Sequence, residues 1–442
     1  MSAVTERSAP AARGRAPHPA RAEAVRGFAP FAGAAVLLTV GVMTGYKADE
    51  WQGDWGATAA LLHTGLLILI PLAAAAGCWQ GGRERRRRTE ELWATAARPP
   101  LPRFLASALP TAAWVALGYL TGVALALLAC RPYALGGGPR LGLLPGDTVA
   151  LVAASLTGQV LGRVVPTRLA APLLALAGYV GLGLLERSPA DPSHELSPAR
   201  LVGDAQLPVW WQPAAMAAWT GGLALAAVLA YTARRRVTAL LPLAAAVAAG
   251  VLLVQTGDGL WRPDPLSQRQ VCDTSTTPAI CVNARYAGLL PQVKEALSGI
   301  TDKLEGVENL PERWDDLPGG PDDRAHLPMV TPIGRSVVRG RLTDPRQYAW
   351  EAAAALEGHG NCDDPRVAEL DELVEHYLAP SPGESHFDDL YRDGTKAERA
   401  EQRREEAGRA RLAAMSAGER RDWLSAYFAT TGRCDVKGVP AL

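Results

Sequence analysis

Long apolar runs with almost no charge fill the first 256 residues of the chain, and the remainder has no run of comparable length. Most of them hold about 18–25 residues, enough for a helix to cross a hydrocarbon core of about 30 Å. Their Ala, Leu, Val and Gly content also allows close helix packing in lipid. The pattern predicts seven spans, the fourth of which is weakest because it is short and contains Gln159: Phe28–Tyr46, Ala57–Trp79, Phe104–Ala129, Thr148–Gly162, Leu169–Leu185, Trp211–Thr232 and Val237–Gln255.

The part after residue 256 has the apolar spacing of helices in a water-soluble domain. Ser416 and Glu419 form a capping-box pattern that opens the last of these helices, whose apolar stripe holds Trp423, Leu424, Tyr427 and Phe428. The other predicted elements are helices over Ala287–Leu304, Pro345–Glu357, Asp364–Tyr377 and Thr395–Met415, a short strand at Ser336–Val338, and a linker at Leu260–Asp264. The predicted fold is an all-α polytopic membrane domain (28–256) followed by a mainly helical domain (257–442).

Charge predicts the orientation in the membrane. The first 256 residues carry an excess of about nine positive charges, and the rest a similar negative excess. With the N-terminus inside, the inner connections hold about 17 Lys and Arg against about five in the outer ones. The arginines that set this topology are Arg83, Arg85, Arg86, Arg87, Arg88, Arg234, Arg235 and Arg236. Residues 1–27, rich in Ala, Pro and Arg, then form a disordered cytoplasmic tail, and seven spans place residues 257–442 outside the cell membrane.

Cysteine usage fits an extracytoplasmic C-terminal domain. Four of the six cysteines, Cys272, Cys281, Cys362 and Cys434, lie in it, and disulfides persist in oxidising compartments. Four cysteines allow three pairings, of which we favour Cys272 with Cys281 and Cys362 with Cys434. The alternative is four free thiols in a cytosolic domain. A zinc site is disfavoured because neither CxxC spacing nor a clustered histidine pair is present.

The segment 81–103 has both charge and helix-forming chemistry. Five arginines in the six positions 83–88 form a block that no bilayer admits cheaply. Thr89 can then cap a short helix with Glu90 and Glu91 in its first turn, and the prolines that follow Arg98 stop that helix. The arginine run alone is explained by topology and by binding to anionic lipid. The helix adds a second interpretation, a docking site for a cytoplasmic partner.

This order of basic residues, TEELWATAARP and a new span from Phe104 resembles the cytoplasmic coupling segment of ABC-2-type transporter permeases. The resemblance implies a transport subunit that works with a separate ATPase subunit, with a second permease copy as a further candidate partner. It implies a docking surface at Thr89, Glu90, Glu91, Leu92, Trp93 and Thr95. Ala96 and Ala97 depart from the more usual Leu-Pro pair, and the seventh span and the C-terminal domain depart from the six-span permease. The V-C-x8-C-V-N pattern from Val271 to Asn283 is similar to the external domain of a subset of actinobacterial permease-like proteins.

Other functions have weaker support. The chain has no GxxxxGK[ST] loop, so an ATPase of that type would be a separate protein, and neither HExxH nor GxSxG occurs, so we expect no enzyme and no cofactor. The basic runs adjoin spans and do not indicate nucleic acid. The alternative function is a receptor or scaffold that displays the external domain. His63, near the outer end of the second span, is either a proton-relay or substrate-contacting group or a hydrogen-bonded interfacial residue.

Overall fold

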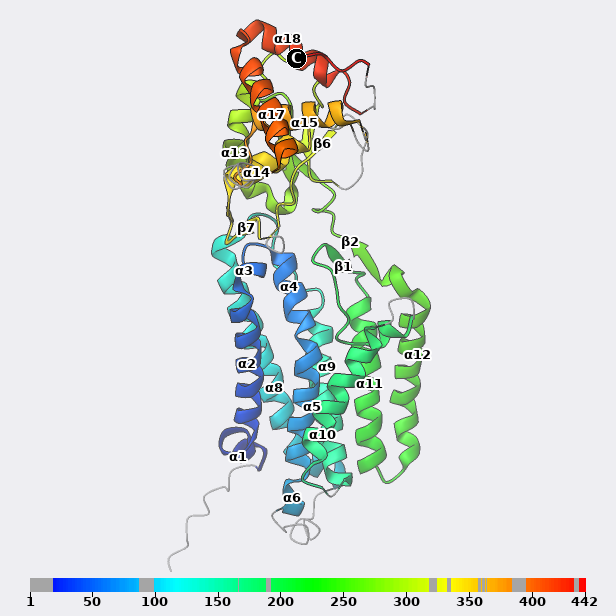
Figure 1. Ribbon diagram of the computed structural model, residues 1–442. Coiled ribbons are helices and arrows are strands. Elements are labelled where there is room, and N and C mark those ends of the chain that lie inside the picture. Colours follow the sequence, from blue (N-terminus) through cyan, green and yellow to red (C-terminus); the bar gives the residue numbers. More distant parts are fainter. Residues whose placement is uncertain are drawn as a thin grey trace, which may run out of the picture.

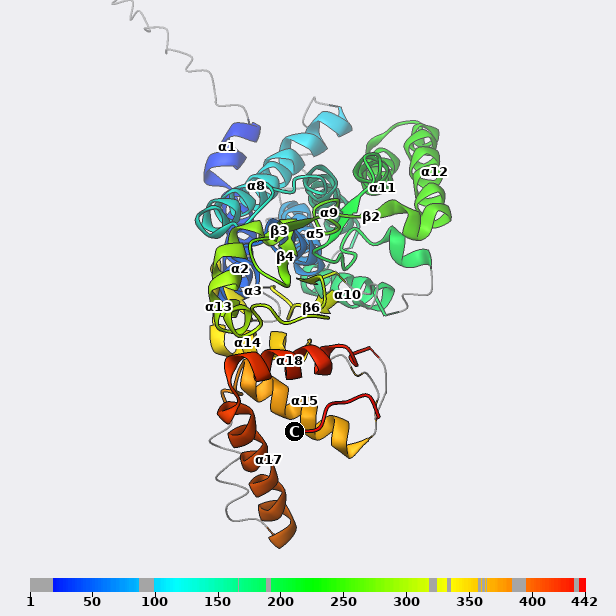
Figure 2. The ribbon, with the colours of Figure 1, turned by 90° about the horizontal axis from the view of Figure 1, so that it is seen from above.

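The computed structural model describes residues 19–86, 99–165, 167–187, 192–317, 324–331, 335–356, 359, 362, 364–383, 395–432 and 437–442. It has two parts, a bundle of long helices and a C-terminal domain seated on one end of that bundle (Figure 1). The C-terminal domain is displaced toward helix α2 and leaves helices α11 and α12 to one side (Figure 2).

Among the described residues, six helical segments are long and apolar enough to cross a membrane: Ala29–Tyr46, Trp55–Gly81, Pro100–Tyr133, Leu144–Val164, Gln212–Thr232 and Arg236–Leu260. Within them the α-helices are α2 (Ala29–Tyr46), α4 (Trp55–Thr64), α5 (Leu66–Gly81), α8 (Pro100–Cys130), α9 (Leu144–Val164), α11 (Gln212–Thr232) and α12 (Leu240–Thr256). The predicted fifth span is a shorter apolar helix, α10 (Ala170–Leu185, 16 residues). The predicted fourth span is longer than expected, because Pro145 lies in the first turn of α9 and Asp147 falls inside the helix.

Short elements join the bundle helices. They are α1 (Pro19–Arg26), α3 (Ala48–Trp51), α6 (Arg83–Arg86), η1 (Arg131–Tyr133), η2 (Pro192–Leu196), η3 (Arg236–Ala239) and η4 (Gly257–Leu260). The prediction that residues 1–27 are a disordered tail is wrong for residues 19–26, which form α1. This helix packs on α8, where Trp114 Nε1 donates to the Ala24 carbonyl at 2.8 Å. Its Glu23 also accepts a hydrogen bond of 2.8 Å from Gln80 of α5. Residues 1–18 lie outside the described part. Helices α1 and α6 lie at the end of the bundle opposite the C-terminal domain (Figure 1).

Helices α5 and α9 are in direct backbone contact. Gly77 and Gly81 of α5 face Gly158 and Gly162 of α9, four residues apart in each helix. A Cβ atom at Gly158 would overlap the carbonyl oxygen of Ala74, and one at Gly77 would overlap that of Ser155. Small residues at this spacing let helices approach closely in lipid, where van der Waals packing replaces the hydrophobic effect. The pair therefore forms a rigid centre on which α8, α10 and α11 pack.

The C-terminal domain combines helices with a sheet. Its helical elements are η5 (Ala284–Leu289), α13 (Leu290–Lys303), α14 (Pro345–Ala354), α15 (Pro365–Leu378), α17 (Lys396–Ala414) and α18 (Ala417–Phe428). Strands β3 (Gln270–Asp273), β4 (Ala279–Asn283), β5 (Arg313–Asp315) and β6 (Arg324–His326) form one sheet in that order, with an antiparallel β3–β4 pair and parallel β4–β5 and β5–β6 pairs. Two further pairs are β1 (Gln206–Pro208) with β2 (Trp261–Pro263) and β7 (Val337–Val338) with β8 (Arg341–Leu342).

The four-stranded sheet was not expected, because its strands hold only three to five residues and give little periodicity. The predicted linker 260–264 also differs: part of it is β2, which pairs with the outer loop before α11. The predicted helices are confirmed, and Ser416 and Glu419 make both hydrogen bonds of the capping box. Tyr427, Phe428 and Trp314 are fully buried in the domain core.

Candidate functional site

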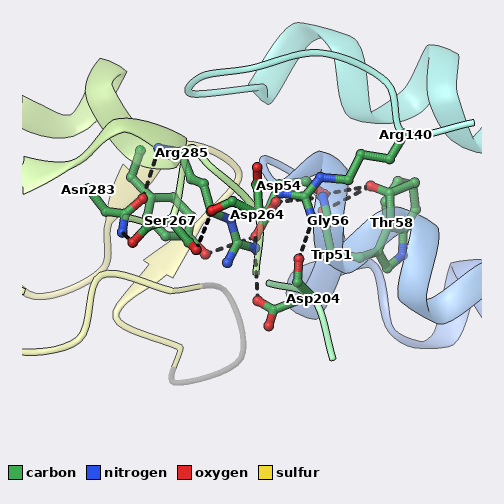
Figure 3. Close-up of polar contacts among 11 residues, drawn as sticks. Trp51, Asp54, Gly56, Thr58, Arg140, Asp204, Asp264, Ser267, Asn283 and Arg285 are labelled. Atoms are coloured by element: carbon green, nitrogen blue, oxygen red, sulfur yellow. Dashed lines mark hydrogen bonds and ion pairs between the residues drawn. The ribbon is translucent and has the colours of Figure 1, made fainter. Parts of the chain in front are cut away.

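A buried carboxylate, Asp54, joins the bundle to the C-terminal domain. Asp54 is the N-cap of α4, and its Oδ1 accepts a hydrogen bond of 2.7 Å from the Gly56 amide. Its Oδ2 accepts from the Arg285 guanidinium (Figure 3). The same oxygen accepts from the Tyr286 hydroxyl at 2.8 Å. Only 4% of Asp54 is exposed. Asp54 is thus both the N-cap of α4 and the residue that anchors the C-terminal domain.

Arg285 is the partner that the C-terminal domain contributes. It follows strand β4, where Asn283 caps the turn by accepting from the Arg285 amide at 3.0 Å. Its guanidinium is 7% exposed and also pairs with Asp204 at 3.0 Å (Figure 3). Burial lowers the pKa of Arg285, but the carboxylates, Asp54 foremost, outweigh that effect and raise it above its usual value. Burial, together with the Asp54 charge, raises the pKa of the Tyr286 hydroxyl. Arg285 therefore stays charged and Tyr286 neutral.

A second arginine ties together the loops at the end of the bundle next to the C-terminal domain. Arg140, in the loop between α8 and α9, donates to the Asp264 carboxylate and to the Asp204 carbonyl (Figure 3). The Asp264 amide in turn donates to the Ala205 carbonyl at 2.8 Å. Three connections at this end of the bundle and the chain that leaves α12 thus meet in one buried ionic network. Removing one member of the network would leave a buried charge without its partner, which is strongly destabilising. The network therefore holds the C-terminal domain on the bundle.

Beneath this junction lies a buried polar cluster inside the bundle. His63 of α4 contacts Asp147 of α9 with its Nδ1 atom 2.9 Å from Oδ1. The Tyr119 hydroxyl of α8 donates to the other oxygen, Oδ2, at 2.9 Å. All three side chains are buried. His63 lies in one of the helical segments long enough to span a membrane, near the end next to the C-terminal domain, and Asp147 is the partner that the sequence did not show. Ionisable groups in such a position are expensive and mark functional sites.

A small cavity of about 10 Å³ adjoins this cluster. His63 and Asp147 line it from the bundle, and Glu195, Arg200 and Trp261 line it from the outer segments. Arg200 pairs with Glu195, and Trp261 Nε1 donates to Glu195 at 3.2 Å. Burial raises the pKa of the Glu195 carboxyl against the opposing effect of Arg200. The cavity thus has acidic and basic walls but the size of a single water molecule.

Six of the predicted topology-determining arginines are described, and they lie at the other end of the bundle. Arg83, Arg85 and Arg86 form α6, and Arg234, Arg235 and Arg236 form the connection between α11 and α12. Arg87, Arg88 and the predicted docking residues Thr89, Glu90, Glu91, Leu92, Trp93 and Thr95 lie outside the described residues. The docking helix thus stays a prediction.

The disulfide prediction is confirmed for Cys272 and Cys281, which face each other across the antiparallel β3–β4 pair. Cys362 is disulfide-bonded, and Cys434 lies outside the described residues. Cys78 and Cys130, at the ends of apolar helices, are free and buried.

Comparison with family models, with curated proteins and with solved structures found no match. The site must therefore be interpreted from its own chemistry. Sequence reasoning missed Asp54, Asp147, Asp204 and Arg285. Only Asp54 had a local signal, since it precedes an apolar helical run in the N-cap position.

Proposed function

We propose that this chain is the membrane-spanning permease subunit of an ABC-type transporter. It would move, or confer resistance to, a small or peptide-like compound and would use a separate ATPase subunit. The observation that supports this proposal is the position of the basic segment. The chain leaves α5 through α6 and re-enters at α8, and both ends of segment 87–98 lie at the end of the bundle opposite the C-terminal domain (Figure 1).

Counting passages through the bundle supports an odd number of spans. Six crossings would return the chain to the end where it began, yet α1 and the C-terminal domain lie at opposite ends (Figure 1). Counting α10 as a seventh span, tilted or in locally thinner lipid, resolves this. The arginines of α6 and of the α11–α12 connection then lie on the cytoplasmic side. The disulfide-bonded domain lies outside, as its Cys272–Cys281 bond favours.

Co-purification tests the ATPase partner. The full chain, solubilised from its native membrane, should retain an ATP-binding protein. Replacing Leu92 and Trp93 together by alanine should abolish that retention. Trp210→Ala is the matched control, since Trp210 is exposed on an outer loop and its loss should leave retention intact. Absence of any ATP-binding protein from the wild-type preparation would contradict the permease proposal.

A receptor or scaffold is the second candidate, and one observation favours it. A groove of about 260 Å³ lies between α15 and α17, far from the bundle, with Arg366, Arg404 and Glu369 among its walls. A ligand held there would be presented outside the membrane. This function predicts that a charge reversal such as Arg366→Glu abolishes the physiological response while the Leu92 and Trp93 substitutions leave it unchanged.

A further inference from the structure

Two polar contacts fix how α8 and α9 face each other. On the outer side of the middle of α8 Tyr119 donates to Asp147, and near the inner end Gln159 Nε2 donates to Ser107 Oγ at 2.9 Å. The two contacts are equally far apart along both helices, so the helices run antiparallel in constant register. This register places Val115 level with Leu151, and Thr111 level with Ser155.

The inner half of this interface is polar. The Thr111 and Ser155 hydroxyls and Gln159 Oε1 are buried and have no hydrogen-bond partner among the described residues. Below them, Arg163 donates to Ser107 at 2.7 Å and to Glu84 of α6 at 3.1 Å. Polar groups without partners are costly in a bundle surrounded by hydrocarbon, so hydroxyls in this state indicate a role other than packing.

Beyond Asp147 the polar groups continue outside the α8–α9 interface, on α4, η2 and the neighbouring segments, and reach the surface. Asp258, whose side chain is 99% exposed, lies 3.7 Å from Arg200, and Arg200 pairs with the buried Glu195. Glu195 and His63 line the same cavity, and His63 contacts Asp147. Gln212, at the start of α11, also lines this cavity, and its buried Oε1 has no partner among the described residues.

Between the two polar halves lies one apolar layer. Val115 and Leu151 are both fully buried and lie level with each other. Tyr119, one turn further out, is about 17 Å from the outer end of α8 at 1.5 Å per residue. The interruption therefore falls near the middle of the bundle.

We propose that the α8–α9 interface is a proton pathway, closed in this conformation by Val115 and Leu151, with His63 as its outer proton-binding group. When Asp147 is a carboxylate it can only accept, so His63 Nδ1 then carries the proton; no described residue makes a hydrogen bond to Nε2, which is left as the acceptor. A proton from the cavity binds Nε2, and the Nδ1 proton passes to Asp147, which leaves a neutral imidazole and a protonated carboxyl. The ligand is a proton because an imidazole and a carboxylate in direct contact exchange one, and the adjoining cavity is too small for anything larger than a water molecule.

The charged and titratable groups around His63 can be named from each element packed on it. Asp147 comes from α9, Tyr119 from α8, and Glu195 with Arg200 from the segment at η2. Helices α2 and α5 place no acidic, basic or histidine residue against it. Among the described residues the surroundings thus hold two carboxyl groups, one guanidinium and the Tyr119 hydroxyl, with His194 on the far side of Glu195 at 3.4 Å. The two carboxyl groups favour the arrival of a positive charge.

Proton flux into liposomes tests this proposal, which does not depend on the ATPase partner. The full chain is reconstituted with a trapped pH indicator, and the outside is acidified under a valinomycin-clamped potential. The variant V115A/L151A should raise the flux by about tenfold or more, equal to a barrier lower by about 1.4 kcal/mol. Adding Asp147→Asn should return the flux to the wild-type level. Leu125→Ala, on the lipid-facing side of α8, is the matched control and should change nothing.

Three outcomes would overturn the proposal. The first is an equal proton flux in V115A/L151A and in the Leu125→Ala control. The second is an unchanged flux when Asp147→Asn is added to V115A/L151A, and the third is that V115A/L151A leaks Na⁺ and a trapped dye as readily as protons, which would mean a disrupted bundle. Infrared difference spectra of the otherwise unchanged protein give an independent measurement. Acidification should produce the band of a protonated buried carboxyl that disappears in Asp147→Asn. A band that persists in that variant would also refute the assignment.

Discussion

The strongest quantitative prediction concerns Arg285, which connects the C-terminal domain to the bundle. Replacing Arg285 by methionine keeps most of the side-chain volume and removes the charge. Asp54 would then keep the Gly56 amide and the Tyr286 hydroxyl but would lose its counter-ion while only 4% exposed. Removing one partner of a buried ion pair costs about 3–5 kcal/mol. The cost should appear as local undocking of the domain.

Hydrogen exchange measures that undocking directly. Amides in residues 53–58 and 284–290 should lose protection by about 100-fold or more, because every 1.4 kcal/mol is a factor of ten. Arg339→Met is the control at the same junction. Arg339 is half exposed and lies 3.8 Å from the exposed Asp49, so its loss should cost about 0–1 kcal/mol.

A double substitution separates charge from packing. If the cost of Arg285→Met comes from a carboxylate without its partner, adding Asp54→Asn should recover part of it, because the asparagine can still cap α4. If the double variant is as unstable as Arg285→Met or less stable, the loss is one of packing and the electrostatic reasoning is wrong.

Three further substitutions test the fold. Gly158→Leu should separate α5 from α9, because its Cβ would overlap the Ala74 carbonyl. The free energy of unfolding should fall by several kcal/mol, in the upper range for overpacking. A thermal melt of the detergent-solubilised protein measures the loss, with Gly181→Leu as the control because a Cβ there meets open space. Asp316→Asn should remove part of the pH dependence of stability. Burial raises the pKa of the Asp316 carboxyl, so its stabilising contribution is present at low pH and is lost as the pH rises through the folded pKa. The variant also loses one of the hydrogen bonds that Asp316 accepts from Gln270 and the Asn283 amide, so thermal melts should compare the change with pH and not the melting temperature itself; a pH dependence equal to that of the wild type would refute the assignment. Ser416→Ala should lower the stability of α18 by about 1 kcal/mol by removing its N-cap. The loss should appear as faster amide hydrogen exchange in residues 417–420. Ser298→Ala, on the exposed side of α13, is the control and should leave exchange in residues 417–420 unchanged.

Local patterns were enough for those features whose cause lies within a few residues. The long apolar helices follow from hydrophobic content alone, and six of them recur at nearly the expected positions. Both hydrogen bonds of the Ser416 box depend on residues three apart. Cys272 and Cys281 are nine residues apart, so a single hairpin was enough to join them. Such features depend on short-range sterics and hydrogen bonding, which the order of residues determines directly.

The tertiary structure decided everything that depends on residues far apart in the chain. Arg285 and Asp54 are 231 positions apart, and Asp147 is 84 positions from His63. No periodicity connects such pairs, because a buried charge needs a partner in space and not at a fixed spacing. The contact between the glycines of α5 and α9 and the apolar layer at Val115 and Leu151 also arise only once two helices adopt one register. The sequence by itself therefore determined that the chain has a helical membrane part and a disulfide-bonded domain, and packing decided which of its charged groups meet.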